Sequence, residues 1–187
     1  MTKQSTARIF IIVGNESSGK DEIIRAIKDL GALHAEAISK YTSRDPKNDD
    51  GPEMICQCQF VKSVDNLSYE VVKKDGSKEI CDIVYLRNGN QYGFNSKNIW
   101  QGLKRRMFQV IVVSEVEAIN KLREIFGGLI VLVYVHSHNS HGNYAELSIF
   151  VDNFDKFDHV LIYEDKKEDL FDQVFRLFRA YESGLLN

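Results

Sequence analysis

The beginning of the chain changes from one hydrophobic pattern to another within a few residues. Residues 9–13 (Ile-Phe-Ile-Ile-Val) form a continuous apolar run, which is typical of a parallel strand covered on both faces. From Lys20 onward the apolar residues recur at helical spacing, and Gly31 supplies a stop signal. The apolar face of this predicted helix carries Ile23, Ile24, Ile27 and Leu30. Residues 9–30 are therefore predicted to form a strand, a loop and a helix.

The middle of the chain is predicted to contain short strands joined by turns. Strands are expected over residues 33–39, 56–61, 69–73 and 80–86, and turns at 75–76 and 88–89. Residues 40–51 are polar and rich in turn formers, so we expect a loop there, either one that holds a ligand or a plain surface loop. The strands over residues 56–61, 69–73 and 80–86 together predict a small antiparallel sheet, whereas residues 33–39 are expected to be the second strand of the chain.

The last part of the chain returns to alternating helices and strands. Helices are expected over residues 98–107, 115–126 and 167–185, and strands over residues 108–113, 129–135 and 159–163. Trp100 lies on an apolar helical stripe and is expected in the core rather than in a ligand stack. The final helix has a broad apolar face that suits packing on a sheet. The pattern as a whole predicts an α/β fold.

The segment between the first strand and the first helix has the pattern of a phosphate-binding loop. We call this segment, Gly14-Asn15-Glu16-Ser17-Ser18-Gly19-Lys20-Asp21, the phosphate loop. Its glycines let backbone amides turn inward, the helix N-terminus favours an anion, and Lys20 can reach the terminal phosphates of a nucleotide. The alternative is an ordinary strand-to-helix turn. The phosphate-loop interpretation predicts ATP as the bound nucleotide.

Asp21 departs from the full phosphate-loop motif, which has Ser or Thr after the lysine to bind magnesium. A carboxylate binds Mg²⁺ directly or through water, but without a cation it repels polyphosphate. Asp21 is therefore the candidate metal ligand. The sequence predicts Mg²⁺ as a cofactor and a strong dependence of nucleotide binding on it.

The composition of the 187 residues, 43% hydrophobic and 27% charged, is ordinary for a globular protein. The formal net charge of -3 gives no general basic surface, so we expect neither nucleic acid nor an anionic membrane as a partner. No segment approaches the roughly 18 consecutive apolar residues of a membrane span, and residues 1–7 lack an apolar core. These features favour a cytoplasmic location. The oligomeric state is left open.

Three cysteines, Cys56, Cys58 and Cys81, are too few for a disulfide framework, which fits a reducing compartment. Residues two apart in a strand share a face, so Cys56 and Cys58 can be neighbouring core residues or half of a metal site. The core interpretation is favoured because the spacing is not that of a Cys-x-x-Cys knuckle.

The order of elements and several local motifs resemble the guanylate kinase family and related P-loop nucleoside monophosphate kinases. In that family a Ser-x-Thr-Thr-Arg-x-x-Arg loop after the second strand grips the acceptor phosphate, and Thr42-Ser43-Arg44 followed by Lys47 stands in the same place. Arg44 matches, whereas Lys47 replaces the second arginine and offers a point charge instead of a bidentate grip. The resemblance implies that Arg44 is catalytic and that both residues bind substrate. The other interpretation of Arg44 is a surface cation.

The resemblance also implies other acceptor-binding positions. Gly89-Asn90-Gln91-Tyr92-Gly93-Phe94 is similar to the family's Gly-Asn-Tyr-Tyr-Gly-Thr, which makes Tyr92 the phosphate-binding tyrosine. Phe94 replaces a hydroxyl that helps to read guanine, and Lys40 replaces the serine of the earlier loop. Two positions that read the acceptor are therefore changed, which puts strict guanylate specificity in doubt.

Two acidic residues complete the set that the resemblance suggests. Glu115 occupies the place of the family's acidic residues near magnesium and the base, although Ser114 followed by acids also suits a helix cap. Asp82 corresponds to the guanine-reading glutamate after a one-residue adjustment. Both are candidate substrate-binding residues.

The segment between the last two core strands differs most from the family. Guanylate kinases place arginines in this mobile lid, but residues 137–156 contain none. Loss of such a group can lower turnover by about 1000-fold unless another cation substitutes. His136, His138 and His141 lie in or beside this segment. They suggest either a metal site, or phosphate contacts, or a loop without a ligand.

The resemblance implies a three-layer P-loop kinase core with a parallel sheet, formed by residues 1–39 and 97–187 of a single domain. It also implies an acceptor-binding β subdomain over residues 40–96 and a reduced lid over about 136–157. The leading hypothesis is an ATP-dependent phosphotransferase that acts on GMP or another nucleoside monophosphate. The alternatives are a kinase for a phosphorylated sugar and a catalytically weak module that binds phosphate or a phosphopeptide.

Overall fold

The central element is a five-stranded sheet in a computed structural model that describes residues 7–15, 18–30, 34–137, 156–164 and 166–186. The strand order is β12-β11-β1-β10-β2, and every neighbouring pair is parallel. The strands are β1 (Ile9–Gly14), β2 (Ala35–Ala37), β10 (Phe108–Val112), β11 (Ile130–Ser137) and β12 (His159–Tyr163). β1 lies in the middle of the sheet, where its apolar run is buried along its whole length, as expected for a strand covered on both faces.

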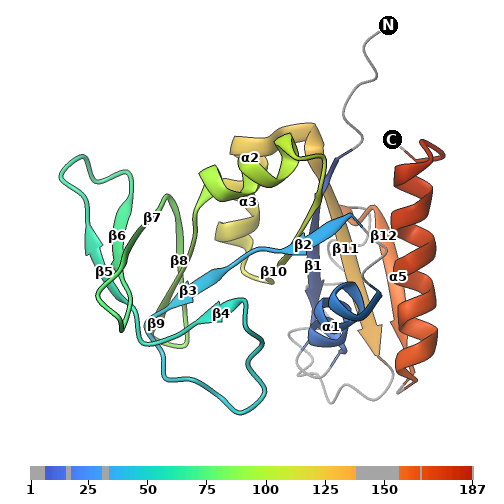
Figure 1. Ribbon diagram of the computed structural model, residues 1–187, viewed down its shortest axis with the longest axis horizontal. Helices are drawn as coiled ribbons and strands as arrows, with labels where there is room; N and C mark the ends of the chain where they lie inside the picture. Colours follow the sequence, from blue (N-terminus) through green and yellow to red (C-terminus); the bar gives the residue numbers. More distant parts are fainter. Residues whose placement is uncertain (1–6, 16–17, 31–33, 138–155, 165, 187) are drawn as a thin grey trace, which may run out of the picture.

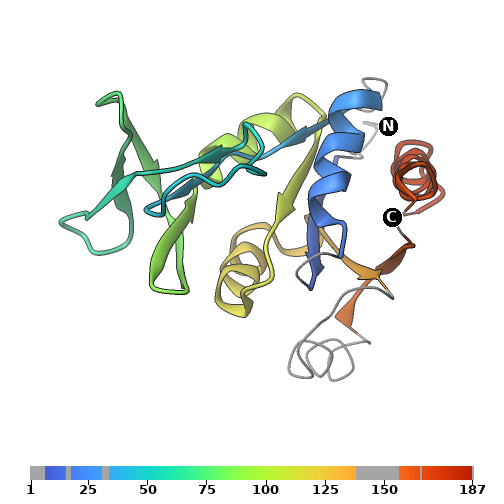
Figure 2. The ribbon, with the colours of Figure 1, turned by 90° about the horizontal axis from the view of Figure 1, so that it is seen from below.

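Helices cover both faces of this sheet (Figures 1 and 2). Alternate side chains of β1 point to opposite faces, so Phe10 and Ile12 pack with one cluster while Ile9 and Ile11 pack with the other. The first cluster includes α1 (Lys20–Leu30) and α5 (Lys167–Glu182), and the second includes α2 (Ser96–Lys104) and α3 (Val116–Phe126). A short 3₁₀ helix, Gly127–Leu129, follows α3. The predicted three-layer α/β core is confirmed.

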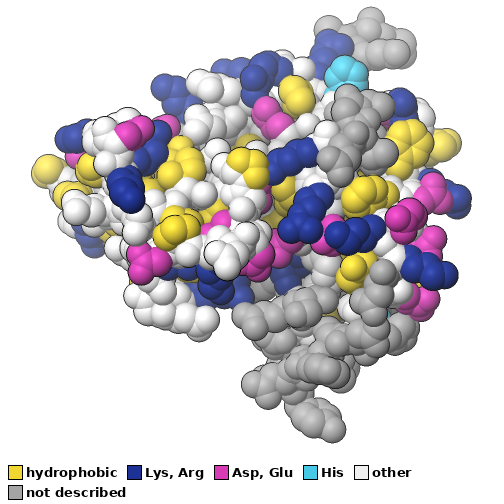
Figure 3. Space-filling model, turned by 60° about the horizontal axis from the view of Figure 1, so that its bottom comes forward, with side chains coloured by type: hydrophobic (Ala, Val, Ile, Leu, Met, Phe, Trp, Pro, Cys, Tyr) yellow, Lys and Arg dark blue, Asp and Glu magenta, His cyan; other side chains and the backbone are white. Residues whose placement is uncertain are grey.

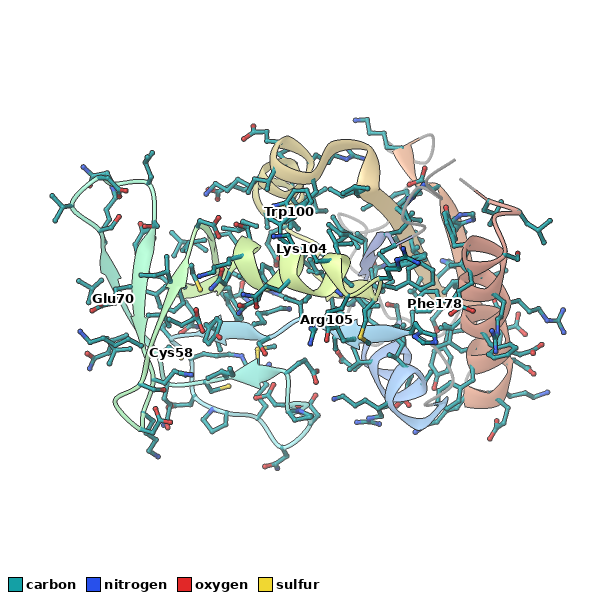
Figure 4. The ribbon with its side chains drawn as sticks, turned by 45° about the horizontal axis from the view of Figure 1, so that its top comes forward. Cys58, Glu70, Trp100, Lys104, Arg105 and Phe178 are labelled. Carbon is teal, nitrogen blue, oxygen red and sulfur yellow. The ribbon has the colours of Figure 1, made fainter. Side chains whose placement is uncertain are left out.

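The final helix packs on the sheet as its apolar face predicts. Phe178 extends from α5 toward the sheet (Figure 4), is 1% exposed, and its ring centroid lies 4.3 Å from that of Phe10. Phe108 and Tyr181 join the same aromatic cluster. Trp100 differs from its predicted core position: it lies against Phe126 at 5.0 Å between ring centroids but stays 39% exposed at the edge of α2.

Two small sheets form the β subdomain, at the opposite end of the molecule from α5 (Figure 1). One has the order β4-β3-β9-β8 and the other is the meander β5-β6-β7. Their bounds are β3 (Lys40–Thr42), β4 (Met54–Ile55), β5 (Gln59–Lys62), β6 (Tyr69–Val72), β7 (Lys78–Cys81), β8 (Ile83–Arg87) and β9 (Asn90–Phe94). A separate small core of buried residues, Tyr41, Cys58, Val71, Cys81 and Val84, belongs to this part of the chain.

Two strand predictions and one loop prediction in this part are wrong in detail. The expected strand 80–86 is interrupted at Asp82, and its halves, β7 and β8, belong to different sheets. The expected strand 56–61 begins only at Gln59, because Gln57 takes a φ of 57° and residues 57 and 58 donate hydrogen bonds to Arg44 O and Thr42 O. The expected loop 40–51 begins with strand β3. Only the last two cases involve partners distant in sequence, because β7 and β8 each pair with a neighbouring strand of the chain.

The cysteines of this part show no sign of a metal centre. Cys58 and Cys81 are buried in the small core and Cys56 is half-buried. Within the described ranges, no group of three or more His, Cys, Asp or Glu side chains is placed to hold a metal ion.

The surface mixes both signs of charge. Figure 3 shows Lys and Arg side chains interspersed with Asp and Glu over one face. Among the helices that the structure describes, none has both the length and the apolar character needed to cross a bilayer.

Candidate phosphate-binding site

The phosphate loop connects the carboxyl end of β1 to the first turn of α1, as predicted. Gly19 has a φ of 89°, and a Cβ atom there would lie 2.7 Å from the ring of Tyr163. A Cβ atom at Gly14 would lie 2.5 Å from Ser18 Oγ and 2.7 Å from Val135 O. Both glycines are therefore required by the close approach of neighbouring strands and by the turn itself. Glu16 and Ser17 lie outside the described residues.

Lys20 lies over the loop that precedes it. Its ammonium group donates hydrogen bonds to Gly14 O at 2.6 Å, to Asn15 O, and to Ser18 Oγ at 3.5 Å. The backbone N–H of Glu22 donates to Gly19 O, which begins the helix. The loop thus places a lysine ammonium and a helix N-terminus on the same side, which is the arrangement that favours phosphate.

Groups from the neighbouring core strands hold the phosphate loop in place. The Ser114 hydroxyl, just after β10, donates to Gly14 O at 3.3 Å, and the buried Tyr134 hydroxyl of β11 donates to Asn15 Oδ1 at 3.4 Å. Tyr163, the last residue of β12, packs on Gly19. Sequence analysis missed these supports. The available signal was that each polar group sits at the carboxyl end of a predicted parallel strand, where such ends meet.

Asp21 is exposed in the first turn of α1. Together with Ser18, Lys20, Asp49 and Tyr163 it lines a pocket of about 240 Å³. Carboxylate and hydroxyl oxygens suit Mg²⁺, which usually takes one or two protein carboxylates and completes its shell with water and substrate phosphates. The residues present fit magnesium in this role.

Arg44 forms a bidentate ion pair with Asp50. Its NH1 donates to Asp50 Oδ2 at 2.8 Å and to Asp45 O at 2.7 Å, while NH2 donates to Asp50 Oδ1. The Arg44 hydrogen bond lowers the pKa of Asp50 to about 2, and the hydrogen bond to Asp50 raises the pKa of Arg44. Both side chains are nearly buried, at 13% and 14% exposure. A phosphate at Arg44 therefore competes with an internal carboxylate.

The structure brings Tyr92 to Arg44 but leaves Lys47 at the surface. Tyr92 contributes to the raised pKa of Arg44, after the larger effect of Asp50, and the Tyr92 ring stacks on the ring of Tyr85 with 5.5 Å between centroids. Lys47 is exposed, and its backbone N–H, not its ammonium group, donates to Asp50 at 2.7 Å. Tyr92 of β9 is the register partner of Thr42 in β3, so Tyr92 lies next to the segment that carries Arg44.

The two acidic candidates have separate partners. Glu115 precedes α3 at the N-cap position without a side-chain cap bond, and its Oε1 lies 3.3 Å from Arg87 Nε. Asp82 Oδ1 accepts a hydrogen bond from Ser96 N at 2.8 Å, and its Oδ2 accepts one from Ser96 Oγ. Asp82 therefore anchors the start of α2. Its role in reading an acceptor stays a prediction, as does that of Glu115.

A solved guanylate kinase from Anaplasma phagocytophilum superposes with a TM-score of 0.60, covering 98% of this chain and 88% of that chain at 12% sequence identity. The fold is guanylate kinase-like. At 12% identity the likeness shows the fold and leaves the substrate undefined. No family model matches the chain, and no curated protein sequence matches it.

The segment expected to form a lid, residues 136–157, falls mainly outside the described residues. His136 lies in β11, stacked near Tyr134 with 6.4 Å between ring centroids. His138 and His141 lie outside the described part, so their predicted metal or phosphate role is untested.

Lys40, which the sequence indicates only as the replacement of a serine, contacts the end of a core strand. Its ammonium group donates to Val112 O at 2.5 Å, at the carboxyl end of β10, and lies 5.8 Å from the centre of the Phe94 ring. Desolvation by the surrounding protein lowers the pKa of Lys40 to about 8, while Glu115 opposes that shift. The sequence offered one sign of this desolvation: Lys40 stands between Ile38 and Tyr41, and both of these residues are buried.

Proposed function

We propose that the chain is an ATP-dependent phosphotransferase of the guanylate kinase type. The observation that carries the proposal is the phosphate loop, with Lys20 and a helix N-terminus directed to one side, inside a guanylate-kinase-like fold. The phosphate loop holds the donor nucleotide. Arg44 and Tyr92 hold the phosphate of the acceptor, with Lys47 adding charge at the rim.

The chemistry assigned to these residues is positioning and charge neutralisation, because phosphoryl transfer needs little covalent help from the protein. Lys20 leaves the loop carbonyls to bind the β- and γ-phosphates. Asp21 holds magnesium, which would neutralise the phosphate charge. Arg44 exchanges its carboxylate partner Asp50 for the acceptor phosphate, a bidentate ligand of the same geometry. The acceptor is GMP, another nucleoside monophosphate or a phosphorylated sugar.

Calorimetric titration with ATP, with and without magnesium, tests the donor site. Wild-type protein should bind MgATP, and Lys20→Ala should abolish both binding and transfer. Lys28→Ala is the matched control, because Lys28 lies on the same helix, is exposed and pairs with Glu53 at 2.7 Å. Absence of MgATP binding by the wild type would refute the proposal.

A panel of acceptors with radiolabelled ATP tests the acceptor site. Arg44→Ala should chiefly lower acceptor use and leave MgATP affinity unchanged. Arg105→Ala is the control, because Arg105, just after α2, also contacts both oxygens of a carboxylate, that of Glu36, at 2.8 and 3.0 Å. Equal loss of ATP affinity in both arginine variants would contradict this division of roles.

One observation favours a second candidate, a phosphate-binding module with little turnover. Residues 137–156 contain no arginine to assist phosphoryl transfer. Such a module would bind phosphorylated ligands through Arg44 without consuming ATP. Turnover of MgATP with any member of the acceptor panel excludes it.

A further inference from the structure

The loop between β3 and β4, residues 43–53, runs along the helix that follows the phosphate loop. Near its end, the Glu53 carboxylate pairs with Lys28 of α1 at 2.7 Å. Asp49, four residues earlier, lines the same pocket as Asp21 in the first turn of α1. Asp21 and Lys28 are seven residues apart, which is about two helical turns, so they lie on one face of α1. The β3–β4 loop therefore meets this face at both ends and brings Asp49 to the donor pocket.

The position of Asp49 is set by its backbone neighbours. Asp50 N donates to Lys47 O at 3.2 Å, which closes a turn with Asp49 inside it. The Asp50 carboxylate is itself held by Arg44 and by Lys47 N. The Asp49 side chain is exposed, and within the ranges that the structure describes its carboxylate makes no hydrogen bond or ion pair. The turn thus presents a carboxylate that is free to bind a ligand.

The charges around the donor pocket leave two acids unbalanced. The Glu22 carboxylate, which also lines the pocket, is paired with Arg25 at 2.7 Å and with Lys167 at 3.2 Å. Asp21, like Asp49, makes no side-chain hydrogen bond or ion pair in the described part of the chain. Two free carboxylates in a pocket beside the phosphate loop repel the phosphates of a nucleotide. A divalent cation between the carboxylates and the phosphates would remove this repulsion.

Magnesium fits the chemistry and the size of this pocket. Mg²⁺ prefers oxygen ligands, keeps several of its waters, and usually takes one or two protein carboxylates together with substrate phosphates. The pocket of about 240 Å³ has room for a hydrated ion, since each water takes about 30 Å³. Asp21 and Asp49 supply the two carboxylates from different elements, the first from α1 and the second from the β3–β4 loop.

We propose that Asp49 is a second carboxylate that binds, together with Asp21, the magnesium ion accompanying the donor nucleotide, either directly or through a water. This inference rests on the proposed phosphotransferase function and adds a residue of the β3–β4 loop to the donor site. The same loop carries Arg44. One segment therefore contacts both the metal of the donor and the phosphate of the acceptor.

The test is calorimetric titration of ATP into wild type and Asp49→Asn, once with magnesium and once with EDTA. Asp49→Asn should bind MgATP about 10- to 100-fold more weakly, the loss typical of a residue that holds a metal through its outer shell. It should bind metal-free ATP at least as tightly as the wild type, because a repelling charge is gone. A purely electrostatic role of Asp49 would tighten both affinities, and a purely structural role would weaken both. Either of these results would overturn the proposal.

A double-mutant cycle tests whether Asp21 and Asp49 bind the same ion. The effects of Asp21→Asn and Asp49→Asn on MgATP affinity should not add, because the two carboxylates share one ligand. Additive effects would contradict a shared ion. Asp49→Glu keeps the carboxylate and should keep most of the MgATP affinity, and a loss as large as that of Asp49→Asn would also count against a metal ligand.

Asp45→Asn is the matched control. Asp45 is an exposed acid of the same loop, but its Oδ1 accepts a hydrogen bond from Gln57 at 2.9 Å. Its replacement should change neither affinity, and thermal unfolding without nucleotide should show that all variants fold. MgATP affinity that is unchanged in Asp49→Asn while the wild type binds MgATP would overturn the role of Asp49 alone. Failure of the wild type to bind MgATP would instead refute the proposed function.

Discussion

The Arg44–Asp50 pair allows a quantitative prediction about stability. Asp50 has a folded-state pKa of about 2 compared with an ordinary value of 3.8. A lowered carboxyl pKa stabilises the folded protein above the unfolded pKa, and this stabilisation disappears as the pH falls through the folded pKa. The difference corresponds to at most about 2 kcal/mol near pH 7, because solvent screening in this loop reduces it. Asp50→Asn should therefore lower the melting temperature by up to roughly 4–8 °C for a chain of this size.

Thermal unfolding of wild type and Asp50→Asn at several pH values between 7 and 2.5 measures this effect. The difference in melting temperature should be constant from pH 7 to about 5 and shrink below pH 4, because wild-type Asp50 then begins to lose its advantage. Asp49→Asn is the control, because it removes the same charge from an exposed neighbouring position. Equal stability of wild type and Asp50→Asn at pH 7, or a difference that does not depend on pH, would refute the reasoning.

Other predictions address the donor site, the acceptor site and the core. Asp50→Asn should also tighten binding of the acceptor phosphate, because Arg44 loses its competing carboxylate; an unchanged or weaker acceptor affinity in calorimetry would contradict this. Gly19→Ala should weaken MgATP binding at least about 10-fold, because an alanine is strained at a φ of 89° and its Cβ meets Tyr163. Adding Tyr163→Ala should leave most of this loss in place, and full recovery would show that only space mattered. Asp21→Ser should make ATP binding less dependent on magnesium, since the carboxylate that repels free ATP is gone; titrations with and without EDTA measure this. Phe178→Ala should lower the free energy of unfolding in urea by about 3–5 kcal/mol, as expected for a fully buried aromatic residue, and a loss below 1 kcal/mol would place it outside the core.

The strand, loop and helix at the start of the chain were predictable because their signals are local. The apolar run of β1, the two glycines and the helical spacing after Lys20 lie within about twenty residues, and each has one main structural solution. The strands and helices of the parallel sheet follow from the same kind of pattern. The glycine positions were correctly interpreted for the same reason, although the sequence did not show that Tyr163 and Val135 make them necessary.

The strands of the β subdomain were less predictable because a hydrophobic period does not show where a run divides between two sheets. An apolar run from Ile80 to Leu86 is compatible with one strand, and only contacts with β6 and β9 divide it at Asp82 between two sheets. The segment from Cys56 to Cys58 is likewise bent by hydrogen bonds to residues 42 and 44. A sequence period cannot report which distant backbone a strand will meet.

For the candidate site, the sequence by itself determined which residues are chemically suited to bind phosphate, because glycines, Lys20 and Arg44 carry their character in any fold. The tertiary structure decided the state of those residues. It paired Arg44 with Asp50, turned Asp82 to the start of α2, and placed the Lys40 ammonium group against Val112 O at the end of β10. The physical reason is that charge, burial and hydrogen-bond saturation depend on neighbours from other elements, and those neighbours are fixed only when the sheets come together.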